Sequence, residues 1–356
     1  MRLRQNPMQT IAGPSLVMVI ALTTAILALG ARCDQMEAHK ILMPIVRGDW
    51  WKIADDNPDV EPFQIVQDGT SNTCDFTIFQ DTADTWHAIA CVRGTDAPGQ
   101  RVFHHWTSPK LTEENWTPRG LLKWPRGTRL GKPTSVQAPH CFTYEGTYYC
   151  FYNSGGAARA MIGKDGITWR VFHNRQGNAE LFPMGRDVMI FQDTARKRWM
   201  AFYCGHIEQD GQRKAAMVAR TAPALAGPWN DDVLSIRTAG NPESPFVAHR
   251  GEHYYLLQQM TVYISNTPER FEGEPLTHLT GIWYSGKWAP EIISCEGQDY
   301  LAGYGRGLWL AKLDWVPMTR AEAEEHARPI LDKVRRGREA ARQREARRTT
   351  QQASEK

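Results

Sequence analysis

The sequence predicts an all-β protein built as a five-bladed β-propeller, with an N-terminal signal segment and a C-terminal basic helical tail. Three observations lead to this fold class. The six residues "IFQDTA" occur twice, at 78–83 and at 190–195. Helical patterns are almost absent from residues 41–315. Five segments also share one form, in which a small or acidic residue leads into an apolar strand, a turn and an aromatic strand. Repeats of about 50 residues with several short strands each are typical of propeller blades.

The first 33 residues predict a segment that directs export. Arg2 and Arg4 precede an apolar run at 14–31, and small residues lie near Gly30. This order is typical of a secretory signal. The run is nearly long enough to span a bilayer, so an uncleaved membrane anchor is the alternative. We expect a secreted or otherwise extracytoplasmic protein that contacts a membrane only if that anchor is retained.

The propeller is predicted over residues 41–315. Its five repeated segments are "CDFTIFQDTADTWHAIACV", "QAPHCFTYEGTYYCFYN", "RDVMIFQDTARKRWMAFYC", "ESPFVAHRGEHYYLLQQ" and "WAPEIISCEGQDYLAGYG". Each is predicted to be a hairpin, with turns at Glu145-Gly146, Arg250-Gly251 and Glu296-Gly297. Further strand-like pieces follow each hairpin and complete four strands per blade. An irregular β-sandwich is the alternative, but it does not explain an identical hexapeptide two units apart.

Four of the seven cysteines are placed symmetrically about two predicted turns. Cys141 and Cys150 bracket one turn, and Cys74 and Cys91 bracket another. Residues directly opposed on a hairpin have Cα spacings compatible with a disulfide. Two disulfides and two pairs of buried thiols both fit this pattern.

The net charge of +3 hides an uneven distribution. Residues 333–356 carry nine Lys or Arg against three Glu, so the tail is +6 and the rest of the chain is −3. The body therefore lacks the basic excess of a nucleic-acid-binding protein. The tail, residues 318–356, is predicted to be a frayed helix or disordered. Binding of a cell surface or an acidic polymer is a further use for it.

Three acids recur where the inner strands of the blades begin. The aligned lead positions of the five segments are Asp75, Gln137, Asp187, Glu243 and Trp288. The first strand of each blade lies against the central axis, so the lead residues are expected to converge at one end of it. Clustered carboxyls repel one another, and their pKa values separate. One proton donor and one ionised carboxylate are what the hydrolysis of a glycosidic bond requires.

The pieces "GRDVMIF", "NPESPFV", "QAPHCFTYEGTYYCFYN" and "WAPEIIS" resemble the five-bladed propeller glycoside hydrolases, the superfamily of families 43, 62, 32, 68 and 117. The resemblance covers residues 41–315 and is nearest in style to family 43. It implies that Asp75 is the base, that Glu243 is the general acid, and that Asp187, preceded by Arg186, holds the sugar and tunes the pKa of the acid. It also implies hydrolysis with inversion, on plant- or algal-type polysaccharides or their oligosaccharides.

The chain departs from the patterns of these families at two places. The "WMNDPNG"-like opening of the fructosidase branch is absent, since this part of the first blade reads "SNTCDFTIF". The proline that often follows the acid of the third blade is Val188 here. The assignment of Asp75 and the identity of the sugar therefore rest on the order and spacing of the acids alone.

Four further residues are predicted to contact substrate. His140 and Gln137 are candidates for hydrogen bonds to sugar hydroxyls, and Trp288 for stacking on a sugar face. Glu291 in "WAPEII" is predicted to support the acids from behind. A structural role is the alternative for each of them.

Other features bear on cofactors and on turns. Asp81 and Asp193, inside the two copies of "IFQDTA", are predicted to be turn residues rather than catalytic ones. No metal-binding motif, phosphate-binding loop or nucleophile elbow is present. We therefore expect no cofactor, with a structural Ca²⁺ as the alternative.

Two rival functions fit the same sequence. One is a carbohydrate-binding propeller that has lost catalysis, which the altered motif of the first blade and Val188 suggest. The other is a phosphorolytic or transferase relative, which requires a basic phosphate pocket, and Arg186 and Arg306 are the candidates for it. The sequence leaves the oligomeric state open.

Overall fold

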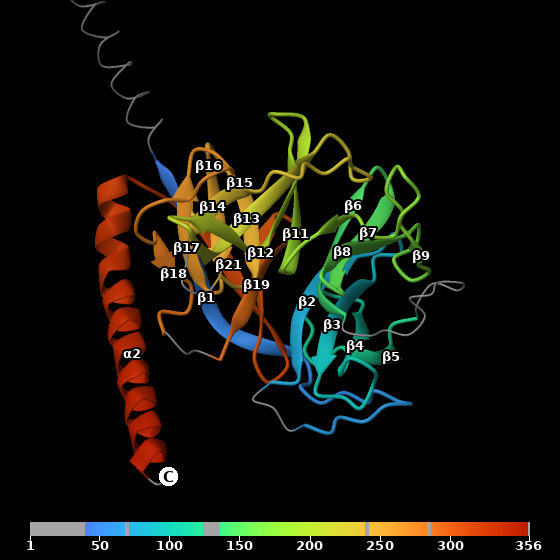
Figure 1. The fold of residues 1–356 in the computed structure, drawn as a ribbon, viewed down its shortest axis with the longest axis horizontal. Coiled ribbons are helices and arrows are strands. Elements are labelled where there is room, and N and C mark those ends of the chain that lie inside the picture. Colours follow the sequence, from blue (N-terminus) through green and yellow to red (C-terminus); the bar gives the residue numbers. More distant parts are fainter. Residues whose placement is uncertain (1–39, 68–70, 124–135, 239–241, 283–285, 355–356) are drawn as a thin grey trace, which may run out of the picture.

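The computed structural model describes residues 40–67, 71–123, 136–238, 242–282 and 286–354. The predicted signal or anchor at residues 1–33 lies outside these ranges. The described chain folds into five antiparallel sheets arranged around a common axis, followed by one long helix (Figure 1). This confirms the five-bladed propeller with a helical C-terminal tail.

Each sheet is one blade, and the strands run from the axis outward. Blade one comprises β2 (Thr73–Gln80), β3 (Trp86–Arg93), β4 (Arg101–Ser108) and β5 (Thr117–Leu121). Blade two comprises β6 (Gln137–Tyr144), β7 (Thr147–Ser154), β8 (Ala157–Gly163) and β10 (Phe182–Pro183), with β9 (Arg170–Val171) also paired to β8. Blade three comprises β11 (Arg186–Asp193), β12 (Arg198–Gln209), β13 (Gln212–Ala222) and β14 (Leu234–Thr238).

The remaining two blades complete the ring. Blade four comprises β15 (Pro245–Arg250), β16 (His253–Gln258), β17 (Thr261–Ser265) and β18 (Thr277–His278). Blade five comprises β19 (Trp288–Cys295), β20 (Gln298–Tyr304), β21 (Leu308–Met318) and β1 (Ile41–Ala54). The outer strand of blade five therefore comes from the start of the described chain. Its pairing with β21, from Ile41–Met318 to Ala54–Leu308, closes the ring.

The inner strands β2, β6, β11, β15 and β19 contact one another in that order, and β19 returns to β2. The core lies between neighbouring blades, where large apolar side chains from facing sheets pack together. The largest fully buried ones include Trp106 in blade one, Phe151 in blade two, Phe202 in blade three and Tyr255 in blade four. This packing holds the five inner strands at fixed positions around the axis.

Every inner strand begins with the same backbone irregularity. Five non-glycine residues at equivalent places have positive φ: Asp75 (33°), Ala138 (46°), Asp187 (62°), Ser244 (44°) and Ala289 (48°). The strand register shifts at this point in four of the blades. A bulge of this kind bends the strand and redirects its side chains.

The predicted alignment of lead positions was wrong by one residue in three blades. Ala138, Ser244 and Ala289 are the true equivalents of the two lead aspartates, so Gln137, Glu243 and Trp288 each lie one position earlier. The prediction matched acidic side chains, whereas the feature that the blades share is the backbone conformation. The acids nevertheless lie at the same end of the axis.

Two of the predicted turns are confirmed and one is shifted. Glu145-Gly146 and Glu296-Gly297 are two-residue turns in which both residues have positive φ. In blade four Arg250 pairs with His253, so the turn residues are Gly251 and Glu252 rather than Arg250 and Gly251.

The paired cysteines lie where the sequence placed them. Cys74 is the direct cross-strand partner of Cys91, and Cys141 is that of Cys150. All four are buried free thiols. They add to the apolar packing between blades one and two.

The acids of the two "IFQDTA" copies occupy turns, as predicted. Asp81 accepts hydrogen bonds from the backbone amides of Ala83 and Thr85, both at 2.8 Å. The Asp193 carboxylate is fully buried and pairs with Arg196 at 3.3 Å and with Arg198 at 3.0 Å.

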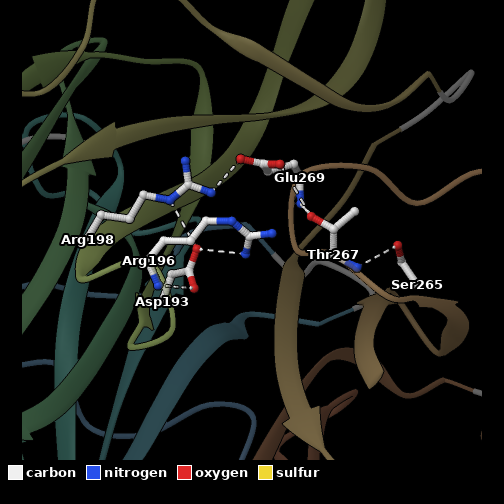
Figure 2. A network of polar contacts seen from close by, with 6 residues as sticks. All are labelled: Asp193, Arg196, Arg198, Ser265, Thr267 and Glu269. Carbon is white, nitrogen blue, oxygen red and sulfur yellow. Dashed lines mark hydrogen bonds and ion pairs between the residues drawn. The ribbon is translucent and has the colours of Figure 1, made fainter. Parts of the chain in front are cut away.

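The network around Asp193 continues into blade four (Figure 2). Arg198 donates from its other side to Glu269 at 2.5 Å. Glu269 follows β17 and is bonded through its backbone amide to Thr267. The turn acid of blade three therefore helps to fasten that blade to the next.

The helix α2 (Arg320–Ser354) follows blade five and lies along one side of the propeller (Figure 1). Thr319 and Glu322 form a reciprocal capping box at its start, with the Glu322 carboxylate 2.8 Å from the Thr319 amide. Ala323 and Ala327 are buried, and the helix contacts β18, β1 and β21. Within the described residues, no helix is long and apolar enough to cross a membrane.

Candidate active site

A cavity of about 330 Å³ opens at the end of the axis where the inner strands begin. This volume lies in the range of small-molecule sites. Its lining residues are Asp75, Arg93, Arg101, Gln137, Arg186, Asp187, Glu243, Ser244, Gln259, Trp288 and Tyr304. Six of the eight residues predicted for the site are therefore brought together here, although they come from all five blades.

A second cavity of about 40 Å³ continues down the axis from the first. Both cavities are lined by Asp75, Asp187 and Ser244. The other two predicted residues, His140 and Glu291, line this inner cavity only. They are thus one layer deeper than the remaining six.

Asp75 follows Cys74 at the bulge of β2 and is partly exposed to the cavity. Among the described residues, none donates a hydrogen bond to its carboxyl group. Burial by the surrounding protein raises the pKa of Asp75 to about 7, and the charge of Asp187 raises it further, while Arg101 opposes the shift. A carboxyl group in this state exchanges its proton near neutral pH.

Asp187 is held far more firmly. Its carboxylate accepts hydrogen bonds from the Ser244 amide at 3.1 Å, from the Cys204 thiol at 3.3 Å and from Arg186 at 3.2 Å. Its own amide donates to the Asn153 side chain at 3.3 Å. Burial raises the pKa of Asp187, and the neighbouring Arg186 guanidinium opposes that effect. The side chain is therefore fixed in one orientation by blades two, three and four.

Glu243 makes a bidentate ion pair with Arg186 across the boundary between blades three and four. Nη2 of Arg186 lies 2.7 Å from Oε1 of Glu243, and Nη1 contacts Oε2. Arg186 also donates to the Pro242 carbonyl at 3.2 Å. The hydrogen bond with Glu243 raises the pKa of Arg186. One guanidinium thus binds both acids of blades three and four.

Glu291 and His140 join neighbouring blades below the site. The Glu291 carboxyl accepts from the Thr77 hydroxyl and the Ile78 amide, both at 3.0 Å, which links blade five to blade one. His140 Nε2 lies 3.2 Å from the Ile190 carbonyl, which links blade two to blade three. Burial raises the pKa of Glu291 to about 8 and lowers that of His140 to about 4, so both are mainly uncharged at pH 7.

Sequence reasoning missed the residues that the second strands contribute. Arg93, Cys204, Gln259 and Tyr304 each lie at or beside the end of a second strand, or on it, opposite the head of an inner strand. The available signal was the hairpin itself, because folding each segment about its turn places these residues beside the lead positions. Arg101, at the start of β4, had no comparable signal.

No group of three or more His, Cys, Asp or Glu side chains suited to a metal ion is found in the part of the chain that the structure describes. The polar side chains at the cavity are instead three carboxyls, three guanidiniums and two amides.

Known structures share this fold at low sequence identity. A thermostable family-43 glycoside hydrolase superposes with a TM-score of 0.51 and 16% identity, over 73% of this chain and 92% of the other. A complex of BT0996 with RGII has a TM-score of 0.50 and 12% identity, over 79% and 94%. The sequence matches no protein-family model and no curated protein. The propeller fold that the sequence motifs implied is thus found among glycoside hydrolases.

Proposed function

We propose that this protein is a glycoside hydrolase that cleaves O-glycosidic bonds of polysaccharides or oligosaccharides by acid–base chemistry between carboxyl groups. The observation that carries the proposal is the meeting of Asp75, Asp187 and Glu243, from blades one, three and four, at one cavity. The fold, which is that of a known family-43 glycoside hydrolase, agrees with it.

Asp75 is the proposed base that activates water. Its carboxyl group accepts no hydrogen bond from the described residues, so its oxygens are available to a water molecule. A base works best when its pKa is close to the operating pH, and the pKa of Asp75 is raised to about 7. The cavity in front of it gives the water and the sugar access.

Glu243 is the proposed acid that protonates the leaving oxygen. Arg186 contacts both of its carboxylate oxygens, so a proton can be passed on only after one of these contacts is released. The Glu243 side chain is about a quarter exposed, at 27%, and that of Arg186 is 41% exposed, so substrate can reach both. Binding of the sugar is proposed to draw Arg186 away from one oxygen.

Asp187 is the proposed positioning residue. Its three hydrogen bonds fix the carboxylate in place, and its charge raises the pKa of Asp75. Removal of this charge is expected to make the base weaker as well as to loosen the sugar. Gln137 and Trp288 line the same cavity and are proposed to contact the sugar directly.

Hydrolysis with inversion is proposed from the resemblance to family 43. Inverting enzymes hold the two carboxyls roughly 6.5–9.5 Å apart, which leaves room for a water molecule, whereas retaining enzymes hold them about 5–5.5 Å apart. Proton NMR of the first sugar released distinguishes the two outcomes, because the product anomer is inverted in one and retained in the other.

The experiment that tests the function is hydrolysis of a panel of aryl glycosides and natural oligosaccharides by wild type and by Glu243→Gln. The panel contains arabinofuranosides, xylosides, galactosides, fucosides and fructosyl donors. Loss of the acid is expected to lower kcat by about 10²- to 10⁴-fold, and by less for substrates whose leaving group needs no protonation. Glu269→Gln is the matched control, because Glu269 also belongs to blade four but lies in the network of Figure 2. Turnover that is equal in wild type and Glu243→Gln would contradict the proposal.

A non-catalytic carbohydrate-binding propeller is the second candidate function. The observation in its favour is that Arg186 contacts both oxygens of Glu243 in the ligand-free protein. If this ion pair persists when sugar binds, Glu243 cannot act as an acid. Binding of a sugar without turnover of any panel member would establish this second function.

Export completes the proposal. The apolar run at residues 14–31 is of the kind that directs secretion, with membrane attachment as the alternative. The proposed substrate is a carbohydrate outside the cytoplasm, and the proposed chemistry assigns no cofactor.

A further inference from the structure

Two arginines lie directly opposite each other in blade one, at the wall of the candidate active site. Arg93 ends β3, Arg101 begins β4, and the two are cross-strand partners. Like charges at directly opposed positions destabilise a sheet. A cross-strand pair of arginines in a cavity therefore requires a negative charge nearby.

The described residues do not supply enough negative charge for this pair. Arg93 donates from Nε to the Ser71 carbonyl at 2.7 Å, which is a neutral partner. Among the described residues, the Arg101 side chain has no hydrogen bond and no ion pair. The acid that influences it is Asp75, which feels the charge of both arginines. One carboxyl thus faces two guanidiniums.

The other acids of the cavity are already engaged. Arg186 takes up both oxygens of Glu243 and one oxygen of Asp187. Burial raises the pKa of Asp75 to about 7 and also raises that of Asp187. Three guanidiniums therefore face at most three negative charges, and fewer at neutral pH. This excess is local, since the chain outside the tail carries −3.

We propose that Arg93 and Arg101 form an anion-binding subsite and that the substrate carries a negatively charged group on the sugar bound there. The proposal rests on the proposed hydrolase function and names its substrate class. Arginine binds carboxylate and sulfate groups with paired N–H donors. Gln137, Gln259 and Trp288 line the same cavity and provide the amide and aromatic groups suited to the hydroxyls and the apolar face of a sugar.

The anionic group is a carboxylate in a uronic acid or a sulfate ester in a sulfated sugar. Both present oxygen acceptors that fit two adjacent guanidiniums, so the shared chemistry defines the class. Parallel measurements with each distinguish the two sources.

The test compares charged and neutral sugars of the same configuration. Calorimetric titration of the full-length protein uses galacturonate, galactose 6-sulfate and galactose, and the same set in the gluco series. The readout is the ratio of the affinity for the charged sugar to that for its neutral counterpart. Wild type is expected to favour one charged sugar by about 10- to 100-fold, the effect of hydrogen bonds to a charged group. The preference is expected to weaken as NaCl is raised.

Arg101→Gln is the decisive variant, and it is expected to reduce this ratio to about one. Arg101→Lys keeps the charge and is expected to keep part of the preference, which separates the loss of charge from misfolding. Arg119→Gln is the matched control in the same blade, because Arg119 donates to Thr107 and does not line the cavity. Its ratio is expected to equal that of wild type.

The outcomes separate this proposal from the function on which it rests. A charged sugar that is preferred by wild type but not by Arg101→Gln supports the subsite, even if no glycoside of that sugar is hydrolysed, in which case the hydrolase proposal alone fails. Equal affinity for charged and neutral sugars, or a preference that Arg101→Gln retains, overturns the subsite, even if neutral glycosides are hydrolysed.

Discussion

Blades one and three carry the same hexapeptide on the same inner strand, yet their lead acids are in different states. Asp75 and Asp187 share a positive φ and a place at the cavity. Asp187 is held by Ser244, Cys204 and Arg186, whereas no described residue donates a hydrogen bond to Asp75. The repeated backbone therefore places an acid, and residues of other strands decide what that acid can do.

Each copy of the strand also ends in an acid with another task. Asp81 and Asp193 lie at the turns, where they bond backbone amides or arginines. One strand thus carries a candidate catalytic acid at its head and a structural acid at its end. The following predictions test whether these tasks are separate.

The largest effect is expected from the head of the strand. Asp75→Asn removes the proposed base and should lower kcat by about 10³- to 10⁴-fold, because an amide cannot take up the proton of water. Asp187→Asn should be less severe, since this residue positions the sugar and tunes Asp75. Initial rates on the substrate identified by the panel measure both effects. Equal losses in the two variants would remove the distinction between the blades.

The second effect concerns the end of the strand and falls on stability. Asp193→Asn leaves Arg196 and Arg198 facing a buried neutral amide and should cost about 3 kcal/mol of unfolding free energy. Activity per folded molecule should not change. Urea denaturation measures the loss, and Asp210→Asn, in an exposed pair with Lys214, is the control that should cost less than about 0.5 kcal/mol.

The third effect is a pH dependence assigned to Asp75. Because the base must be ionised and the pKa of Asp75 is raised to about 7, kcat/KM should fall about tenfold for each pH unit below that value. Rates between about pH 4 and pH 9 measure this limb. A limb that lies near the ordinary pKa of an aspartate, about 4, would place the base elsewhere.

The same shift has a consequence for stability with a definite sign. The folded pKa lies above the unfolded value, so the native state binds more protons in between, and stability falls as pH rises from about 4 to about 7. Asp75→Asn should not show this contribution. Its melting temperature relative to wild type should therefore increase with pH across that window, although the variant is inactive.

The smallest effect is expected at Cys204, which donates to Asp187. Cys204→Ala removes one of three hydrogen bonds and should lower kcat about two- to tenfold, whereas Cys204→Ser keeps a donor and should lower it less. The split between kcat and KM shows whether positioning is lost. Cys295→Ala, in blade five and outside the cavity lining, is the control. Identical rates for all three variants would show that this bond has no part in positioning.

The sequence predicted the fold and most of the cavity because both follow from repetition. The hairpins have local turn chemistry, and equivalent strands meet at the axis, so six of the eight predicted residues line one cavity. His140 and Glu291 lie deeper, since the bulge places their positions one layer down the axis.

Other features could not be predicted because they depend on pairing between blades or on register. The ion pair of Arg186 with Glu243 joins residues of two blades, and sequence reasoning considered only the adjacent Asp187. The pairing of Arg93 with Arg101 depends on the register of β3 and β4, which no motif marks.

The pairing of β1 with β21 has a consequence for how the protein is made and how its site forms. The first described strand must wait for the last strand of the propeller, so most of the chain is synthesised before the ring can close. Contacts between such distant segments slow folding. Until closure, blade one is joined to blade five only through the rest of the chain, and the separation of Asp75 from Glu243 is not fixed. A single β-ladder that contributes no residue to the cavity lining thus determines when the site becomes competent. Deletion of β1 is expected to abolish activity while the catalytic acids remain in the sequence.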